Sequence, residues 1–457
     1  MLQVNSEIFK AYDIRGIYGQ DFDNELAYRL GLAFVELRKS DPDYQSGKKL
    51  QIAVGMDMRF SSPALQENLL RGLTSAGADA INIGLVSTPT FYFAVANYNY
   101  DGGIMISASH NPKEWNGFKL VRSKGVPISG DTGINFLRDK IIENHFLISK
   151  TPGNIITNKE VLAAETLMIN NRTDFTKIKK FKIVVDTANG MGVEYIKEIF
   201  SLFPCEIIPL NFNLDGSFPA HEADPLKEEN LEQLKKQVVI RKADLGISTD
   251  GDGDRIFFVD NLGITISPAL IRGLLAKIFL RDMPGAKIGY DVRPGKITED
   301  LIKENGGIPV LTKVGHSLIK EQMLKENIYF AGESSGHFYL NAPTGCFEYP
   351  SIMILNLLIL FSENKQSVSD FIKPYNKYFS SGEINRTVAN AEIVFNKILE
   401  KYSDGTITRL DGISVNYPDF WFNVRASNTE PKMRLNLEAI SKEIMEKKRD
   451  EILTLMN

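Results

Sequence analysis

Hydrophobic and polar positions along the chain follow one plan three times. A short apolar strand ends at an acidic residue, and a polar loop, a periodic helix and a second apolar strand follow. The acidic residues of the three copies are Asp57, Asp186 and Asp291. Each copy predicts a βαβ unit, and in the first we expect Ser62 to cap the helix and Pro63 to lie in its first turn. The shared order favours three α/β domains of common ancestry, although the same plan also occurs in unrelated α/β proteins.

The last part of the chain has a different pattern. Between residues 420 and 439 a strand, a polar loop and a second strand follow one another, and Met433, Leu435 and Leu437 alternate with polar neighbours. A charged amphipathic helix is expected from about Ser441. We therefore predict an α/β protein with three similar mixed α/β domains and a smaller C-terminal α+β domain. The domains are expected at residues 1–150, 151–260, 261–375 and 376–457.

Composition narrows the class of protein. The 457 residues are 43% hydrophobic and 24% charged with a net charge of −4, which is ordinary for a soluble globular protein and gives no reason to expect nucleic acid as a partner. The longest apolar run, residues 349–361, is too short to span a bilayer and predicts an interior helix, so no membrane partner is expected. Cys205 and Cys346 lie far apart without a CxxC spacing. With no signal peptide expected at the start, they favour a cytoplasmic protein.

Five polar stretches break the hydrophobic pattern, and the first is "SASHNP" at residues 107–112. It follows an apolar strand, Gly103–Ile106, and its Asn-Pro pair predicts a turn. We expect Ser109 to be exposed where the strand ends. This stretch alone is compatible with a nucleophilic serine and with an ordinary polar turn.

The second stretch, "STDGDGDR" at residues 248–255, predicts a metal site, with a solvated acidic turn as the alternative. Glycines separate Asp250, Asp252 and Asp254, so the three carboxylates can converge on one point, where they would repel one another without a cation. A hard divalent ion with oxygen ligands, Mg²⁺ above all, fits this set. An EF-hand is excluded because Arg255 and Asn261 stand where that loop needs Gly and Glu. An aspartyl-phosphatase motif is excluded because Asp254 stands where Thr or Val is needed.

The remaining three stretches are weaker when taken singly. "GESSGH" at residues 332–337 offers Glu333 and Ser335 at alternate positions, which suits a sugar diol as well as a helix cap. "RASNTEP" at residues 425–431 offers Arg425, hydroxyls and turn amides of the kind that hold phosphate. "KAYDIRG" at residues 10–16 adds Tyr12 and Arg15 and by itself indicates little.

Taken together and in their order along the chain, the five stretches resemble the α-D-phosphohexomutase family along essentially the whole chain. The resemblance is closest to its bacterial phosphomannomutase/phosphoglucomutase branch. "TKVGHSLIK" at residues 312–320 is similar to the family's sugar-recognition loop, and "NGFKLV" after "SHNP" differs from the glucosamine branch. The resemblance implies four domains around a central cleft. It also implies an enzyme that interconverts hexose 1- and 6-phosphates of mannose or glucose through phosphoserine and hexose 1,6-bisphosphate. Sugar phosphates are the expected partners, the bisphosphate the expected activator, and monomer and homodimer both stay open.

The resemblance implies roles for individual residues. Ser109 with Asp250, Asp252 and Asp254 would hold one Mg²⁺. Around the reacting phosphoryl group would lie Arg15, His110, Lys119 and Arg255, with either His110 or Lys119 moving the proton. Glu333 and Ser335 would bind the ring hydroxyls O3 and O4, which leaves the C2 epimers glucose and mannose nearly equal. The full substrate-binding set is Tyr12, Arg293, Gly315, His316, Glu333, Ser335, Arg425, Ser427, Asn428 and Thr429.

One stretch departs from the family pattern and leaves the sugar preference open. Many members carry an Asp-Asp-Gly type sequence where this chain has "CFEYPS" at residues 346–351, and we expect Glu348 to serve as a helix-start acid. His337 is expected to be structural, and His145 and His221 to be surface or core residues. Alternatives are a phosphoglucosamine mutase, a deoxyribose phosphate mutase, and a non-catalytic relative that binds sugar phosphates. The last would typically lack the serine or a metal carboxylate.

Overall fold

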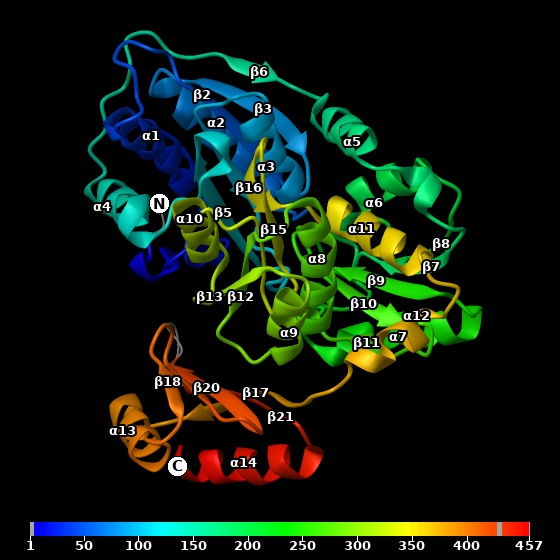
Figure 1. The fold of residues 1–457 in the computed structure, drawn as a ribbon. Helices are drawn as coiled ribbons and strands as arrows, with labels where there is room; N and C mark the ends of the chain where they lie inside the picture. The colour runs from blue at the N-terminus through cyan, green and yellow to red at the C-terminus, as the bar shows by residue number, and fades with distance from the viewer. Residues whose placement is uncertain (1–3, 427–431, 457) are drawn as a thin grey trace. The chain divides into compact units, whose positions relative to one another are not determined.

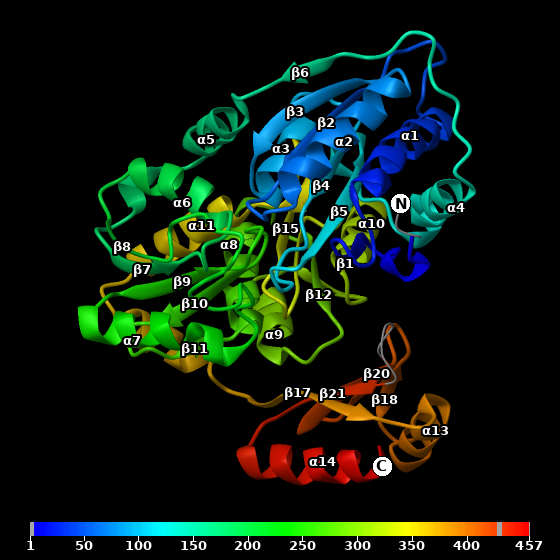
Figure 2. The same cartoon turned by 180° about the vertical axis from the view of Figure 1, so that it is seen from behind.

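The computed structural model describes residues 4–426 and 432–456, which form two compact units (Figures 1 and 2). The first unit contains the described residues up to Ile266 together with His337–Ser369, and the second contains Ser267–Gly336 and the described residues from Asp370 onward. Three α/β sheets and an antiparallel C-terminal sheet confirm the predicted fold class.

The first sheet has six strands in the order β1-β5-β4-β2-β3-β6. Its elements are β1 (Ile14–Ile17), α1 (Asn24–Ser40), β2 (Gln51–Met56), α2 (Ser62–Ser75), β3 (Asp79–Leu85), α3 (Thr88–Asn97), β4 (Gly102–Ile106), β5 (Trp115–Arg122), α4 (Asn135–Glu143) and β6 (Ile155–Thr157). Strand β2 is parallel to β3 and β4, which confirms the first βαβ unit. Helices α1 and α2 approach so closely that a Cβ on Gly72 would lie 2.1 Å from the Tyr28 carbonyl oxygen, so only glycine fits there.

The second sheet has the order β11-β10-β9-β7-β8. It comprises β7 (Lys182–Asp186), β8 (Glu206–Leu210), β9 (Leu245–Thr249), β10 (Ile256–Asp260) and β11 (Thr265–Ile266), with helices α5 (Val161–Arg172), α6 (Gly192–Ser201) and α7 (Glu232–Arg241). Parallel pairing of β7 with β8 and β9 confirms the second βαβ unit. The first unit also holds the antiparallel hairpin of β15 (Phe338–Ala342) and β16 (Gly345–Glu348), followed by α11 (Pro350–Ser362). Helix α11 is almost wholly buried, which confirms the predicted interior helix.

The second unit contains the third βαβ unit. Strand β12 is parallel to β13 and β14, and Asp291 is its last residue. The elements here are α8 (Pro268–Asp282), β12 (Lys287–Asp291), α9 (Lys296–Glu304), β13 (Ile308–Thr312), α10 (His316–Glu326) and β14 (Phe330–Gly332), and the short helix α12 (Val368–Ile372) comes later in the chain.

The C-terminal sheet has the antiparallel order β17-β21-β20-β19-β18. Its elements are β17 (Phe379–Thr387), α13 (Ala391–Lys401), β18 (Thr406–Thr408), β19 (Ile413–Asn416), β20 (Phe420–Ala426), β21 (Lys432–Ala439) and α14 (Lys442–Leu455). Met433, Leu435 and Leu437 are fully buried, so the predicted alternation is confirmed, and α14 runs beside this sheet (Figure 1). Ser441 caps α14 by accepting a hydrogen bond from the Ile444 N–H.

Two local expectations are wrong. Helix α2 starts at Ser62, and neither Ser62 nor the preceding Ser61 caps it with a side chain; the Ser62 hydroxyl donates instead to Asp57 Oδ1 at 2.7 Å. Glu348 ends β16 and is buried, so it precedes α11, whose first turn carries no acidic residue.

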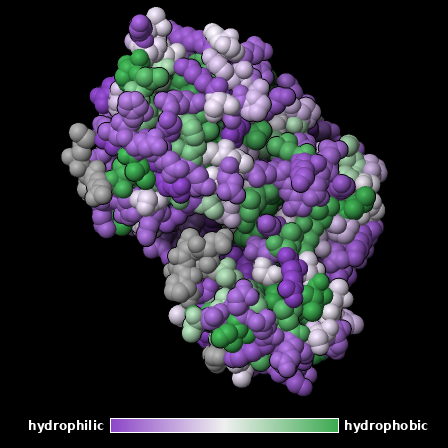
Figure 3. All heavy atoms as spheres, turned by 90° about the vertical axis from the view of Figure 1, so that its left-hand side faces the viewer, coloured by the Kyte–Doolittle hydropathy of each residue, from purple (hydrophilic) through white to green (hydrophobic). Residues whose placement is uncertain are grey.

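The face seen in Figure 3 is covered largely by hydrophilic side chains, with apolar ones in scattered groups. Among residues 4–426 and 432–456, no helix is both long and apolar enough to cross a membrane.

Candidate active site

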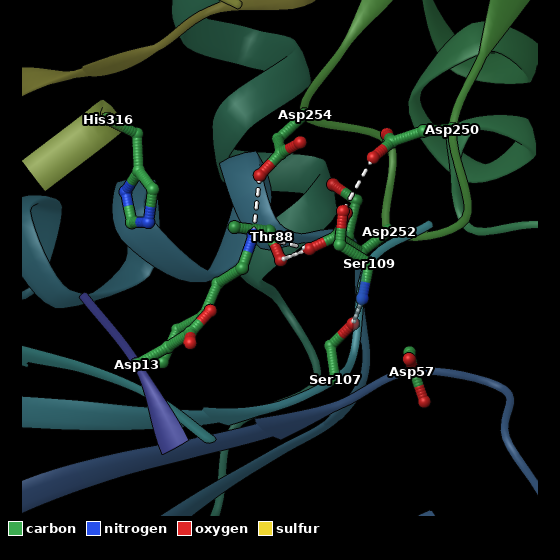
Figure 4. A network of polar contacts seen from close by, with 12 residues as sticks. Asp13, Asp57, Thr88, Ser107, Ser109, Asp250, Asp252, Asp254 and His316 are labelled. Carbon is green, nitrogen blue, oxygen red and sulfur yellow. Dashed lines mark hydrogen bonds and ion pairs between the residues drawn. The ribbon is translucent and has the colours of Figure 1, made fainter. Parts of the chain in front are cut away.

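Ser109 stands three residues beyond β4, at the start of the turn that the Asn-Pro pair predicts. Its backbone has a φ of +51°, a left-handed conformation that a non-glycine residue keeps only where its surroundings hold it. The N–H donates to Ser107 Oγ at 2.9 Å and the hydroxyl to Asp250 Oδ2 at 2.7 Å (Figure 4). Ser109 is only 3% exposed, so the expectation of an exposed serine is wrong, because its hydroxyl packs against the aspartate loop.

The aspartate loop connects the antiparallel strands β9 and β10. Asp250, Asp252 and Asp254 are all buried, and one carboxylate oxygen from each lies within 4.8 Å of the others, as predicted for a metal site. Burial, and then the charges of Asp254 and Asp252, raise the pKa of Asp250 well above its usual value. Asp252 Oδ1 is buried and accepts no hydrogen bond from the described residues. Three buried carboxylates that repel one another, one of them with an oxygen that accepts no hydrogen bond, fit the ligand set of a divalent metal ion.

Lys119 extends from β5 into the same loop. Its ammonium donates to Asp252 Oδ2 at 2.7 Å and to Asp254 Oδ2 at 2.5 Å. Burial alone would lower the pKa of Lys119, but these two carboxylates raise it well above its usual value, so Lys119 is charged. Thr88, which sequence reasoning missed, begins α3 and donates to Asp252 through its hydroxyl (2.6 Å) and its N–H (3.0 Å to the carbonyl oxygen) (Figure 4).

Two arginines supply further positive charge. The Arg15 guanidinium donates to Asn111 Oδ1 at 2.7 Å, in the turn that carries Ser109. Arg255 donates its N–H to Asp250 Oδ1 at 3.1 Å, and its Nε lies 3.9 Å from Asp250 Oδ2. The buried Nε and Nη1 of Arg255 make no hydrogen bond within the described part of the chain. These donors can bind an anion such as a phosphoryl group.

His110 lies beside the Ser109 hydroxyl, with its Nδ1 3.2 Å from Ser109 Oγ. Burial, followed by the charges of Arg255 and Arg15, lowers the pKa of His110 well below its usual value. Its imidazole is therefore neutral at pH 7, and its position is that of a group able to exchange a proton with the site.

His337 and Glu348 are site residues that sequence reasoning placed elsewhere. His337 Nε2 lies 3.1 Å from Asp254 Oδ1, and Glu348 brings a buried carboxylate oxygen within 4.8 Å of both groups. His337 thus contacts a carboxylate of the aspartate loop. The alternation of Glu333, Ser335 and His337 in "GESSGH" was the one sequence signal for it. The departure "CFEYPS" still delivers an acid to the site, although from the end of a strand and not from a helix.

In the second unit two of the predicted sugar-binding residues, Gly315 and Arg293, contact a third, Glu333. Gly315 donates its N–H to Glu333 Oε1 at 3.0 Å, and Arg293 Nη2 lies 3.6 Å from the same oxygen. His316 begins α10 directly after Gly315, and Ser335 is buried. The positive Arg293 and the backbone N–H orient the Glu333 carboxylate.

The other predicted substrate-binding residues lie on separate elements. Arg425 is the next-to-last residue of β20, is largely buried and donates to Glu383 Oε2 at 3.2 Å. Tyr12 is half-buried just before β1 in the first unit. Ser427, Asn428 and Thr429 lie outside the described residues.

Comparison with known families covers nearly the whole chain. The family description "Phosphoglucomutase/phosphomannomutase, alpha/beta/alpha" matches residues 6–146 as domain I, 165–263 as domain II and 269–378 as domain III. The same family's C-terminal domain matches residues 383–455.

Similar proteins agree with this family. A protein named phosphomannomutase from Vibrio cholerae is 39% identical over 443 residues, 94% of each chain. One named phosphomannomutase/phosphoglucomutase from Pseudomonas aeruginosa is 35% identical over 97% of this chain and 94% of its own. The crystal structure of a phosphoglucomutase/phosphomannomutase family protein from Burkholderia thailandensis matches with a TM-score of 0.88 and 31% identity, over 99% of this chain and 97% of that one. This chain is therefore a member of the phosphoglucomutase/phosphomannomutase family.

Proposed function

We propose that this chain interconverts hexose 1-phosphates and hexose 6-phosphates of mannose and glucose, with a phosphoryl group carried on Ser109. The proposal rests mainly on buried polar atoms around the Ser109 hydroxyl that have no hydrogen-bond partner within the described part of the chain. Asp252 Oδ1 has no donor among the described residues, and the Nε and Nη1 of Arg255 have no acceptor there. A cation and a phosphoryl group at Ser109 would satisfy both sets.

Asp250, Asp252, Asp254 and an oxygen at Ser109 would hold one Mg²⁺. When bound, the ion supplies positive charge that offsets the carboxylates and makes the phosphorus more electrophilic. The all-oxygen donor set suits this ion. Lys119 already holds Asp252 and Asp254 in place through its two hydrogen bonds, which reduces the reorganisation needed on binding.

The phosphoryl transfer is assigned to this chain's own groups. A substrate hydroxyl attacks the phosphorus of phospho-Ser109, so that the bond to the sugar oxygen forms while the bond to Ser109 Oγ breaks and the hydroxyl proton leaves. Arg15 and Arg255 stabilise the charge on the transferring oxygens. His110, whose imidazole is neutral, receives the proton, because Lys119 is already protonated between Asp252 and Asp254. The resulting hexose 1,6-bisphosphate reorients in the site by exchanging the positions of its two phosphate groups, and it then returns its other phosphoryl group to Ser109. Added bisphosphate activates the enzyme by phosphorylating Ser109 in the same way.

Substrate recognition belongs to the same proposal. We assign Glu333 and Ser335 to the ring hydroxyls O3 and O4, and Arg425 with residues 427–429 to the phosphate that does not react. The remaining substrate-binding residues are Tyr12, Arg293, Gly315 and His316. We also propose domain boundaries near residues 150, 260 and 375. The separated cysteines favour a cytoplasmic location.

Phosphorus NMR tests this function directly. The protein with Mg²⁺ and a trace of glucose 1,6-bisphosphate receives mannose 1-phosphate, glucose 1-phosphate and glucosamine 1-phosphate in parallel, with the Ser109→Ala variant as control. We expect the first two to become 6-phosphates at comparable rates without release of inorganic phosphate. Conversion of glucosamine 1-phosphate alone would contradict the sugar assignment, and no conversion of any of the three would contradict the proposed function.

A further inference from the structure

We infer that Arg59, which lies between β2 and α2, is a positioning residue that holds the Ser109 turn in its reactive conformation. The Arg59 side chain reaches backbone carbonyl oxygens of that turn, so it acts on the reaction through the turn and touches no reacting atom. The inference rests on the proposed function, because it assigns a role in phosphoryl transfer. It adds a residue that lies outside all five polar stretches.

The guanidinium of Arg59 bonds the turn at four points. Its Nη2 donates to the carbonyl oxygens of Ser109 (2.8 Å) and Asn111 (2.7 Å). Its Nη1 donates to those of Pro112 (2.7 Å) and Trp115 (3.0 Å). One side chain therefore fixes the path of the chain from the end of β4 to the start of β5.

Asp57 holds the guanidinium itself. The Arg59 Nε donates to Asp57 Oδ2 at 3.2 Å and the Arg59 N–H to Asp57 Oδ1 at 3.1 Å, and the Ser62 hydroxyl also donates to Oδ1. Arg59 is 1% exposed, and each of the five N–H groups of its buried guanidinium has an acceptor. A planar fork with five donors can do this, whereas the three donors of a lysine ammonium, on a flexible stem, cannot.

The turn requires such a support. Ser109 has its left-handed φ of +51°, and its carbonyl oxygen packs so tightly on the aspartate loop that a Cβ on Gly251 would approach it to 2.4 Å. The ring of Phe218 covers Arg59, with 5.0 Å between its centroid and the guanidinium carbon. Loss of the four carbonyl bonds would free the turn to relax, and the Ser109 oxygen would move relative to Asp250.

A second copy of the internal repeat contains a similar pair, an aspartate followed two residues later by an arginine that bonds it. Arg293 donates its backbone N–H to Asp291 Oδ1 at 3.2 Å and its Nε to Asp291 Oδ2 at 2.9 Å, as Arg59 does to Asp57, but its Nη2 also donates to Asp291 Oδ2 at 2.5 Å. Asp291 also accepts a hydrogen bond from the N–H of Ser334, in the stretch "GESSGH" at residues 332–337. The contact to the loop differs between the copies, because Arg59 itself bonds the Ser109 turn whereas Asp291 bonds Ser334, and the remaining copy has Ala188 at the arginine position.

The test compares Arg59→Lys and Arg59→Met with a matched control, Arg38→Met. Arg38 is 2% exposed in the same domain and donates to the Asp101 carbonyl oxygen and to Asp43, away from the Ser109 turn. We expect both Arg59 variants to lose about 100-fold in kcat, the effect of a misplacement of about 1 Å, with KM for glucose 1-phosphate little changed. Arg38→Met is expected to lower the melting temperature with kcat retained.

A rescue experiment separates positioning from simple loss of structure. Guanidinium ion added to Arg59→Ala should restore part of kcat, whereas added to Arg38→Ala it should leave kcat unchanged. Wild-type kcat in Arg59→Lys, or equal effects of the Arg59→Met and Arg38→Met substitutions, would overturn the inference. Failure of the proposed function would look different, because the wild-type protein itself would then neither convert sugar phosphates nor carry phosphate on Ser109.

Discussion

Glu165, in helix α5, is a buried carboxyl group that makes the stability of the first unit depend on pH. Its Oε2 accepts a hydrogen bond from the Thr90 hydroxyl at 2.6 Å, and burial outweighs this bond and raises the pKa of Glu165 to about 7. In the unfolded chain the pKa is close to 4.5. Between these two values the unfolded state releases its proton while the folded state keeps it, so stability falls as the pH rises. Above the folded pKa the full loss is about 3 kcal/mol.

The substitution Glu165→Gln removes this loss and keeps a side-chain oxygen for Thr90. We expect the variant to exceed the wild type in stability by about 1 kcal/mol at pH 5 and about 3 kcal/mol at pH 8. Thermal unfolding of both proteins at the two pH values measures the effect, with the exposed Glu160→Gln as control. The gap in melting temperature should widen by several degrees between pH 5 and pH 8. An equal gap at both pH values would refute the reasoning that burial holds Glu165 protonated.

Three further predictions concern the active site. Ser109→Ala should abolish turnover while leaving the melting temperature within a few degrees of wild type, and substantial residual conversion in the NMR assay would remove Ser109 from the mechanism. Asp252→Asn should lower kcat and weaken the dependence of the rate on Mg²⁺ concentration, because one carboxylate of the proposed metal site is lost; an unchanged Mg²⁺ titration would speak against the aspartate site. Gly251→Ala should lower kcat at least tenfold, because its Cβ would meet the Ser109 carbonyl oxygen at 2.4 Å. Gly130→Ala, where a Cβ has no neighbour nearer than 3.8 Å, should retain wild-type kcat, and equal rates for the two glycine variants would contradict that packing.

The elements that local patterns dictate could be predicted from the sequence. The strand ends at Asp186 and Asp291 and the alternation in β21 follow from side-chain periodicity, which needs no knowledge of distant partners. The convergence of Asp250, Asp252 and Asp254 was equally local, since the residues are adjacent along one loop.

What could not be predicted depends on contacts between distant parts of the chain. Ser109 was expected to be exposed because turn residues usually are, but its partner Asp250 is 141 residues away. Thr88 meets Asp252 across 164 residues, and Arg59 reaches Ser109 across 50. Arg59 looks like an ordinary loop arginine in the sequence. Only the fold shows that β2 and β4 are neighbours and that the Arg59 side chain faces the turn after β4.

The most direct test of the central claim is a single-turnover experiment with labelled phosphoenzyme. The protein is phosphorylated with glucose 1,6-bisphosphate that carries labelled phosphate, and the sugar is then removed. Peptide mass spectrometry of one portion locates the label. A second portion is mixed with unlabelled mannose 1-phosphate and Mg²⁺. The account predicts that the label is on Ser109 and passes to the sugar as mannose 1,6-bisphosphate within one turnover. Label on another residue, or label released only as inorganic phosphate, would contradict it.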